Sequence, residues 1–221
     1  MKLAIRAFLK FAVGLAFVGL SLFLPAGTLS YFNAWLFIGM LFIPIFILGV
    51  VLFVKAPALL EKRLNVKEKA ATQKGVVALC ALLFVGGFVI AGLDYRFGWS
   101  SVPAWVVIVA SAVLITSYAL YAEVMRENAY LSRTVEVTEG QRVVDSGFYG
   151  IVRHPMYAVT VWLFLSIPLV LGSWYSLICF APYLIMIVIR ILNEEKLLAA
   201  ELDGYCDYMK RVRYRLIPFI W

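Results

Sequence analysis

Residues 155–192 read PMYAVTVWLFLSIPLVLGSWYSLICFAPYLIMIVIRIL, and this apolar stretch decides the fold of the chain. A helix needs roughly 20 apolar residues to cross the hydrocarbon core of a bilayer, because only bonds within the helix satisfy its backbone there. The stretch is too long for one crossing, and Gly172 and Ser173 interrupt it where Trp174 and Tyr175 suit a membrane interface. It therefore predicts a tight helical hairpin that crosses the membrane twice.

Further apolar runs long enough to span a bilayer precede the hairpin. They are residues 4–24, 34–54, 75–94 and 103–122. The 221 residues are 64% hydrophobic and have a mean hydropathy of +0.93, well above an ordinary water-soluble domain. The sequence predicts an all-α integral membrane protein with about six transmembrane helices. No glycine-rich G-x-G-x-x-G segment follows a strand pattern, so no Rossmann domain is expected.

Lysines and arginines alternate between the loops in a way that predicts the orientation of the chain. Nineteen of the 20 lie in four segments, which are the N-terminus up to Lys10, 55–74, 123–154 and the tail from Arg190. The other three loops hold only Arg96. Because cytoplasmic loops are enriched in these residues, both termini are predicted to be cytoplasmic. The net charge of +7 is explained by this pattern and by lipid headgroups, so nucleic acid is not an expected partner.

Two polar segments remain for chemistry, residues 123–154 and the tail from about 190 to 221. The hairpin joins them, so its open ends are expected to bring them together at one membrane face. The 55–74 loop is expected to lie on the membrane surface as a helix. We therefore divide the chain into N-terminal transmembrane helices at 1–100, a lipid-facing scaffold, and a core with a cytoplasmic tail at 101–221.

The only histidine of the chain, His154, stands directly before Pro155. Proline suits the first turn of a helix and pushes the preceding residue to extended geometry, so His154 marks a junction between loop and helix. The free N–H groups of that first turn favour an anion. An alternative is that His154 is an interfacial side chain bonded to a carbonyl and Arg153 a charge that only sets topology.

Arg190 and Glu194 lie four residues apart, and so on one face of a helix, at the end of an apolar segment. They could form a plain ion pair at the membrane boundary, but ionisable groups at the end of a helical bundle more often mark a site. The cysteines are isolated, and neither a disulfide framework nor a metal site is predicted.

Four elements in order resemble the isoprenylcysteine carboxyl methyltransferase family and the related phospholipid methyltransferases. They are GFYGIVRHPMY at 147–157, the hydrophobic hairpin, RILNEEKLL at 190–198 and GYCDYMKRVRYRLIPFIW at 204–221. The resemblance covers roughly residues 120–221. Val159 stands where the family usually has glycine, and Phe148 where proline is commoner.

This resemblance implies an S-adenosylmethionine-dependent methyltransferase whose cofactor occupies a cytoplasm-facing pocket, while a lipidic or prenylated substrate arrives from the bilayer. It places the substrate on Arg190. It places the cofactor on Gln141, Val143, Val144, Tyr149, His154, Pro155, Met156, Tyr157 and Glu194. Here Glu194 would meet the cofactor's ammonium group or ribose hydroxyls, and His154 with the helix N-terminus would meet its carboxylate.

The chemistry of methyl transfer agrees with this inventory, because it mainly requires that donor and acceptor are held about 3 Å apart. A carboxylate acceptor needs no general base, and Arg190 could hold it in bidentate fashion. An amine acceptor would need a base such as Glu195 or His154. The most direct interpretation is carboxyl O-methylation of an isoprenylcysteine-like molecule.

Three other functions stay open on the sequence. They are a phospholipid N-methyltransferase, an NADPH-dependent enzyme like the sterol reductases, and a non-enzymatic membrane scaffold or small transporter. Binding of adenosylhomocysteine but not NADPH would separate the methyltransferases from the reductase, and a scaffold would bind neither. The methyl acceptor and the oligomeric state are not set by the sequence, because apolar surfaces accept any lipid tail.

Overall fold

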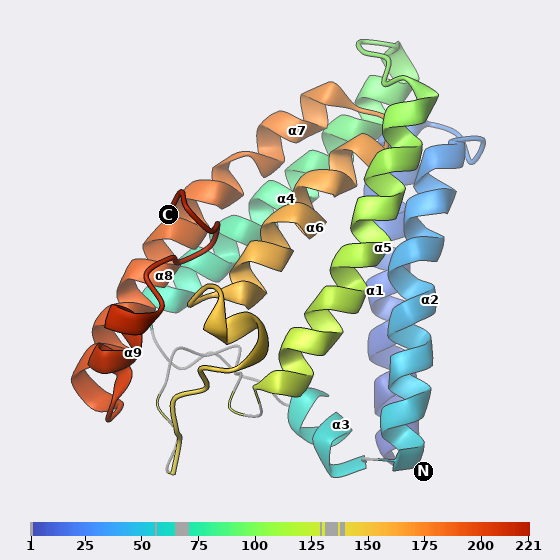
Figure 1. The fold of residues 1–221 in the computed structure, drawn as a ribbon. Helices are drawn as coiled ribbons and strands as arrows, with labels where there is room; N and C mark the ends of the chain where they lie inside the picture. Colours follow the sequence, from blue (N-terminus) through green and yellow to red (C-terminus); the bar gives the residue numbers. More distant parts are fainter. Residues whose placement is uncertain (1, 56, 65–70, 129, 131–136, 138–139) are drawn as a thin grey trace. The chain divides into compact units, whose positions relative to one another are not determined.

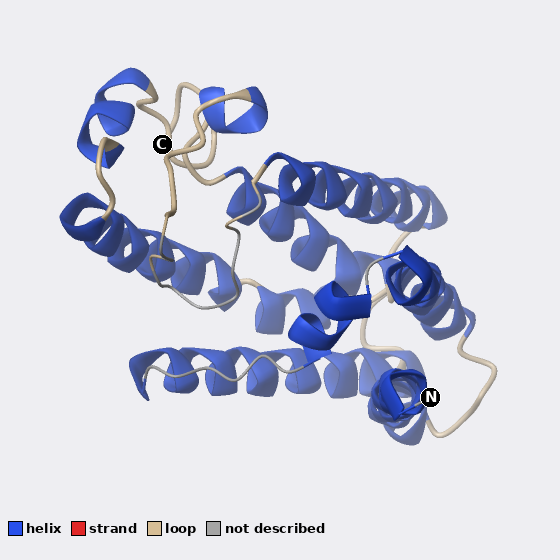
Figure 2. Cartoon of the chain, turned by 90° about the horizontal axis from the view of Figure 1, so that it is seen from below, coloured by secondary structure: helices blue, strands red, loops and turns tan. Residues whose placement is uncertain are grey.

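A computed structural model describes residues 2–55, 57–64, 71–128, 130, 137 and 140–221. Within these ranges the regular structure is helical and contains no strand, which confirms the all-α prediction (Figure 2). The long helices in the first half of the chain are α1 (Lys2–Ala26), α2 (Phe32–Lys55), α4 (Ala71–Phe97) and α5 (Ala104–Glu127), with the short α3 (Pro57–Leu64) between α2 and α4 (Figure 1). The second half contains the 3₁₀ turn η1 (Gly147–Gly150), α6 (Pro155–Val170), α7 (Trp174–Phe180), α8 (Pro182–Glu201) and α9 (Tyr205–Arg211).

The predicted spans all coincide with helices, and the protein is an integral membrane protein. In the described part of the chain, four helical segments are long and apolar enough to cross a bilayer, namely Leu3–Ala26, Phe32–Lys55, Ala104–Glu127 and Trp174–Glu201. Helix α6 is apolar but has only 16 residues. The number of six crossings and the cytoplasmic position of both termini stay predictions. The 55–74 segment contains α3 and the start of α4, and residues 65–70 lie outside the described residues. Its position on the membrane surface stays a prediction.

The predicted hairpin is present, with its break at Gly172 and Ser173 between α6 and α7. Gly172 takes a φ of 78°, a conformation that residues with a Cβ rarely adopt. The second arm differs from the prediction, because it consists of α7 and α8 and not of one helix. Pro182 has no N–H to donate to the carbonyl four residues earlier, so the ladder of hydrogen bonds is interrupted there.

The described chain divides into two compact units. Unit 1 comprises Met1–Ser111 and Ile167–Phe180, and unit 2 comprises Ala112–Ser166 and Ala181–Trp221. The tip of the hairpin thus belongs to unit 1, whereas most of α6 and all of α8 belong to unit 2. The functional division at residues 100 and 101 stays a prediction.

In unit 1, α4 packs against both α1 and α7, and α1 runs antiparallel beside α2 (Figure 1). Gly92 of α4 lies at the contact with α1. A Cβ at this position would stand 2.5 Å from the Leu22 carbonyl oxygen and 3.1 Å from the Ala26 nitrogen, which are backbone atoms and cannot rotate away. The missing side chain therefore allows the two helices to approach closely, as small residues do between membrane helices.

We expect Gly92→Ala to lower the free energy of unfolding by about 1–3 kcal/mol, the usual cost of overfilling a packed interface. Gly86→Ala is the matched control, because Gly86 lies on the same helix and a methyl group added there would have no atom of another segment within 4 Å. Thermal unfolding in detergent measures both variants. Equal melting temperatures for the two variants would contradict the close packing at Gly92.

A buried carboxylate ties the end of α4 to the start of α7 within unit 1. Asp94, 1% exposed, accepts hydrogen bonds from the Ser100 N–H at 2.7 Å, the Ser100 hydroxyl at 2.6 Å and the Ser173 hydroxyl. The Ser173 oxygen in turn accepts the N–H of Ser176 at 3.0 Å and so caps the first turn of α7. These contacts hold the hairpin tip to α4.

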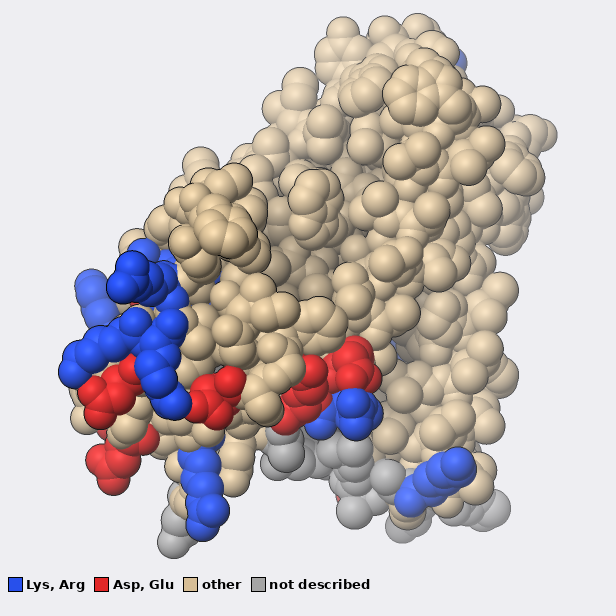
Figure 3. All heavy atoms as spheres, in the orientation of Figure 1, with Lys and Arg blue, Asp and Glu red and all other residues tan. Residues whose placement is uncertain are grey.

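Unit 2 contains the two polar segments singled out in the sequence. Helix α8 packs against α9, and charged side chains gather over α9, the neighbouring end of α8 and the C-terminal segment (Figure 3). Among them, Lys210 pairs with Asp207, and Arg211 pairs with Asp145. The polar groups are concentrated where α8 leaves its apolar part, and the candidate site is there.

Candidate functional site

The site begins at the turn η1, which holds Tyr149. Gly147 starts this turn with a φ of 57°, and the Phe148 N–H donates to the Glu127 carboxylate at 2.9 Å. Tyr149 is 7% exposed, and its carbonyl oxygen accepts the Tyr208 hydroxyl at 2.7 Å. The end of α5 and helix α9 therefore fix the position of Tyr149 from two sides.

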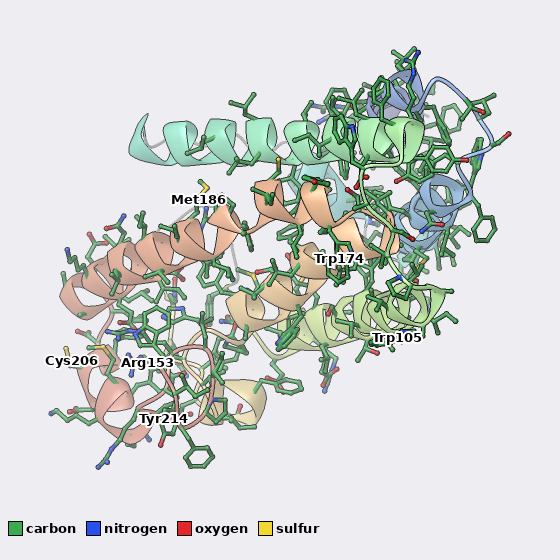
Figure 4. All side chains as sticks on the ribbon, turned by 90° about the horizontal axis from the view of Figure 1, so that it is seen from above. Trp105, Arg153, Trp174, Met186, Cys206 and Tyr214 are labelled. Atoms are coloured by element: carbon green, nitrogen blue, oxygen red, sulfur yellow. The ribbon has the colours of Figure 1, made fainter. Side chains whose placement is uncertain are left out.

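The next residues of the motif lie against the C-terminal segment (Figure 4). The Arg153 N–H donates to the Tyr214 carbonyl at 2.8 Å, and the His154 N–H donates to the Arg215 carbonyl at 2.9 Å. Helix α6 then starts at Pro155, and the Ala158 N–H donates to the His154 carbonyl at 3.1 Å. The predicted junction between loop and helix at His154 is confirmed.

The Arg153 side chain connects the motif, the C-terminal segment and α8. It is 8% exposed, and its Nε donates to Glu195 at 2.7 Å. Its Nη1 donates to the carbonyls of Val212 and Arg213, both at 2.9 Å. Arg153 is therefore buried and bonded within unit 2 to α8 and to the C-terminal segment, which a charge that only sets topology would not require.

Three basic side chains contact the Glu195 carboxylate. Its Oε1 accepts Arg153 and lies 3.2 Å from His154 Nε2, and its Oε2 accepts Arg215 Nε at 2.8 Å. The residue is 6% exposed and does not line the cavity described next. Glu195 thus holds Arg153, His154 and the C-terminal segment in place.

A cavity in unit 2 brings both motifs together. It is lined by Asn128, Tyr130, Gln141, Arg142, Val143, Val144, Tyr149, Arg153, His154, Met156, Tyr157, Glu194, Leu198, Leu202, Tyr205 and Tyr208. Eight of the nine residues predicted to bind the cofactor are in this lining. The ninth, Pro155, is buried at the start of α6 outside the lining. Their roles in binding stay predictions, but their assembly around one cavity is a feature of the fold.

Arg190 does not line this cavity but contacts one residue of its wall. Its Nε donates to the Tyr157 hydroxyl at 2.8 Å, and that hydroxyl donates to the Glu194 carboxylate at 2.5 Å. The guanidinium carbon also lies 5.9 Å from the centre of the Tyr157 ring. Arg190 and Glu194 are therefore linked through Tyr157, with Glu194 on the cavity and Arg190 behind its wall.

The tyrosines on the cavity wall are neutral hydrogen-bonding groups. Burial raises the pKa of Tyr149 to about 12, although a hydrogen bond with Asn128 opposes this, and nearby Glu194 and Glu127 add to the rise. Burial likewise raises the pKa of Tyr205 and of Tyr208 above the usual value. The Tyr205 hydroxyl is buried and has no hydrogen-bond partner among the described residues.

Neither departure from the family pattern lies on the cavity, because Val159 and Phe148 are both absent from its lining. The sequence did not indicate Asn128, Tyr130, Arg142, Leu198 or Leu202 as wall residues. Tyr205 and Tyr208 also line the cavity, and one sequence feature relates them. Their spacing of three residues places both on one face of a helix.

The residues present suit a zwitterionic nucleoside cofactor. Glu194 offers a carboxylate to an ammonium group or to hydroxyls, and His154 and Arg142 offer N–H groups to a carboxylate. Val143, Leu198 and Leu202 offer apolar surface to a flat ring. The described part of the chain contains no group of three or more metal-ligating residues.

Comparisons with known proteins relate the chain to one family and one fold. Residues 105–200 match the model of the "Isoprenylcysteine carboxyl methyltransferase (ICMT) family". No curated protein sequence matches the chain. The solved structure of a eukaryotic intramembrane Ras methyltransferase, ICMT, shares the fold with a TM-score of 0.56 at 20% sequence identity, over 93% of this chain and 75% of that chain. Residues 105–200 thus match the model of the family that the sequence motifs resemble, and the solved structure shows that the chain shares its fold.

Proposed function

We propose that this protein is an S-adenosylmethionine-dependent methyltransferase that esterifies the carboxylate of an isoprenylcysteine-like molecule within the membrane. The observation that carries the proposal is the cavity of unit 2, whose lining brings Glu194 together with nine residues between 141 and 157. The family match over residues 105–200 supports the same reaction class.

The cofactor would supply an electrophilic methyl group bound to a sulfonium, and this chain would supply position and charge. Glu194 would bind its ammonium group or ribose hydroxyls, and His154 would bind its carboxylate. The Glu195 contact at 3.2 Å orients the His154 ring, and the stacked Tyr157 ring, with centroids 5.7 Å apart, supports it. The wall is thus held firmly before any ligand binds, which reduces the cost of ordering it.

The acceptor would be held by Arg190, next to the cavity wall that Tyr157 forms. A carboxylate is already an anion, so no base is required, and a guanidinium can hold one of its oxygens while the other is exposed. Glu195 cannot serve as the base that an amine would need, because Arg153, His154 and Arg215 already engage it away from the cavity. A phospholipid amine would then depend on His154 as its base, whereas a carboxylate needs none, and this difference favours a carboxylate acceptor.

A direct test uses the purified protein in lipid nanodiscs with methyl-labelled cofactor and two acceptors, N-acetyl-S-farnesylcysteine and phosphatidylethanolamine. We expect label to enter the farnesylated acid only, and to be released as methanol by mild base because the product is an ester. Label that stays on the phospholipid after base would instead support N-methylation. Binding of NADPH without binding of adenosylhomocysteine would support the reductase.

Glu194→Gln is expected to weaken adenosylhomocysteine binding by about 10-fold or more, because a hydrogen bond to a charged group is worth about 1.5–3 kcal/mol. Calorimetric titration measures the dissociation constant. Glu201→Gln is the matched control, since Glu201 ends α8 with its side chain exposed and off the cavity. Equal affinity in the two variants would remove Glu194 from the binding site.

A further inference from the structure

The Tyr205 hydroxyl is an unusual group in this fold. Tyr205 is 4% exposed and lines the cavity, yet its oxygen has no hydrogen-bond partner among the described residues. A buried hydroxyl without a partner costs stability, so most buried hydroxyls in folded proteins are paired. The neighbouring Tyr208 follows the rule, because its hydroxyl donates to the Tyr149 carbonyl.

Apolar and aromatic side chains pack against Tyr205. Tyr205 belongs to a core cluster with Leu202, Tyr208 and Val212, and partly buried side chains that include Val143 and Leu198 pack against this cluster. Several of these residues also line the cavity. The charged groups of the cavity are chiefly Arg153 and His154 before α6 and Glu194 on α8, and Arg153 and Glu194 are near enough to act electrostatically on the Tyr205 phenol.

The two kinds of wall suit the two halves of the cofactor. An amino acid head requires charged partners, whereas a purine has two apolar faces and a rim of hydrogen-bonding nitrogens. A pocket of aliphatic and aromatic side chains with one free hydroxyl therefore complements a purine. Such side chains offer less to an ammonium or a carboxylate, because they carry no counter-charge of their own.

We propose that the Tyr205 hydroxyl hydrogen-bonds the adenine ring of the bound cofactor, whose faces pack against the apolar side chains of the α9 cluster. This inference rests on the proposed function. Because the phenol is protonated, it can donate to a ring nitrogen or accept from the exocyclic amine. Tyr205 would then be the residue that completes the nucleoside end of the site.

The experiment compares the native protein with Tyr205→Phe and with Tyr214→Phe, which removes a phenol hydroxyl from the same C-terminal region outside the cavity lining. Dissociation constants are measured for adenosylhomocysteine and for methylthioadenosine, which retains the nucleoside and lacks the amino acid. We expect Tyr205→Phe to raise both constants about five- to tenfold, the effect of one lost hydrogen bond. Tyr214→Phe should leave both unchanged.

The melting temperature without ligand provides a second measurement. It should stay equal or rise in Tyr205→Phe, since the substitution keeps the ring and removes only an unpaired group. A lower melting temperature would show that the hydroxyl has a structural partner, and would overturn the inference.

The outcomes also separate this inference from the function on which it rests. If the native protein does not bind adenosylhomocysteine, the proposed function fails. If the native protein binds it and Tyr205→Phe binds both ligands equally well, only the role of Tyr205 is overturned. A loss of affinity for adenosylhomocysteine alone would place the contact on the amino acid half and overturn the assignment to adenine.

Discussion

Arg190→Ala is expected to reduce the rate of methyl transfer by roughly 100-fold, because truncating one partner of a desolvated charge pair costs about 2–5 kcal/mol. The affinity for adenosylhomocysteine should change far less. The Tyr157 hydroxyl loses Arg190 as a donor in this variant but keeps its own bond to Glu194, so the cavity wall retains its shape. Single-turnover kinetics with labelled cofactor measures the rate, and calorimetry measures the affinity.

Arg190→Lys separates charge from geometry in the same assay. Lysine keeps the positive charge but lacks the planar fork that binds a carboxylate through two parallel N–H groups. Its rate should lie between those of the native protein and the alanine variant. Tyr157→Phe removes the hydroxyl between Arg190 and Glu194. It tests whether Arg190 affects the rate through its contact with Tyr157. Methyl transfer by Arg190→Ala at the native rate would show that Arg190 does not hold the acceptor.

Glu195→Ala is expected to cost about 3–5 kcal/mol of stability, the range for removing one partner of a buried ion pair. The reason is Arg153, which is 8% exposed and would be left without its counter-charge. Arg215 is less affected, because 29% of its side chain is exposed and can be rehydrated. The loss should appear as a lower melting temperature and as early proteolysis of the segment after α9.

The adjacent glutamates provide a built-in comparison for this prediction. Glu194 faces the cavity and Glu195 faces the arginines, so the same substitution should act differently at each. Glu194→Gln should weaken ligand binding and leave the melting temperature unchanged, whereas Glu195→Gln should lower the melting temperature. If Glu195→Gln melts like the native protein, the contacts of Arg153 with the Val212 and Arg213 carbonyls suffice to hold the C-terminal segment.

Much of this architecture could be predicted because its causes are local. Long apolar runs give the helices, and Gly172 with Ser173 gives the turn of the hairpin. The meeting of His154 with the Glu194 and Glu195 pair follows from the hairpin, whose arms return to the same face. The resemblance to a known family then supplied residues such as Val143 and Val144, for which a single sequence has no physical signal.

The remaining features depend on contacts between distant backbone atoms. Arg153 donates to carbonyls near residue 212, and any sequence would provide such carbonyls. The sequence could not predict that the Tyr208 hydroxyl has a hydrogen-bond partner and the Tyr205 hydroxyl has none among the described residues. Both are tyrosines on one face of a helix, and only the groups opposite them differ. The break between α7 and α8 was missed for another reason, because the apolar character of the stretch continues through Pro182.

The tip of the hairpin has a consequence for how such proteins can evolve. Residues 167–180 fold with the first four helices, where Ser173 donates to Asp94 and the Ser176 hydroxyl donates to the Gly87 carbonyl at 2.8 Å. A gene fusion that exchanged the N-terminal helices for unrelated ones would leave these hydroxyls without hydrogen-bond partners in an apolar medium. The N-terminal helices and the hairpin tip therefore depend on each other, and we expect that exchanging the helices alone would destabilise the tip.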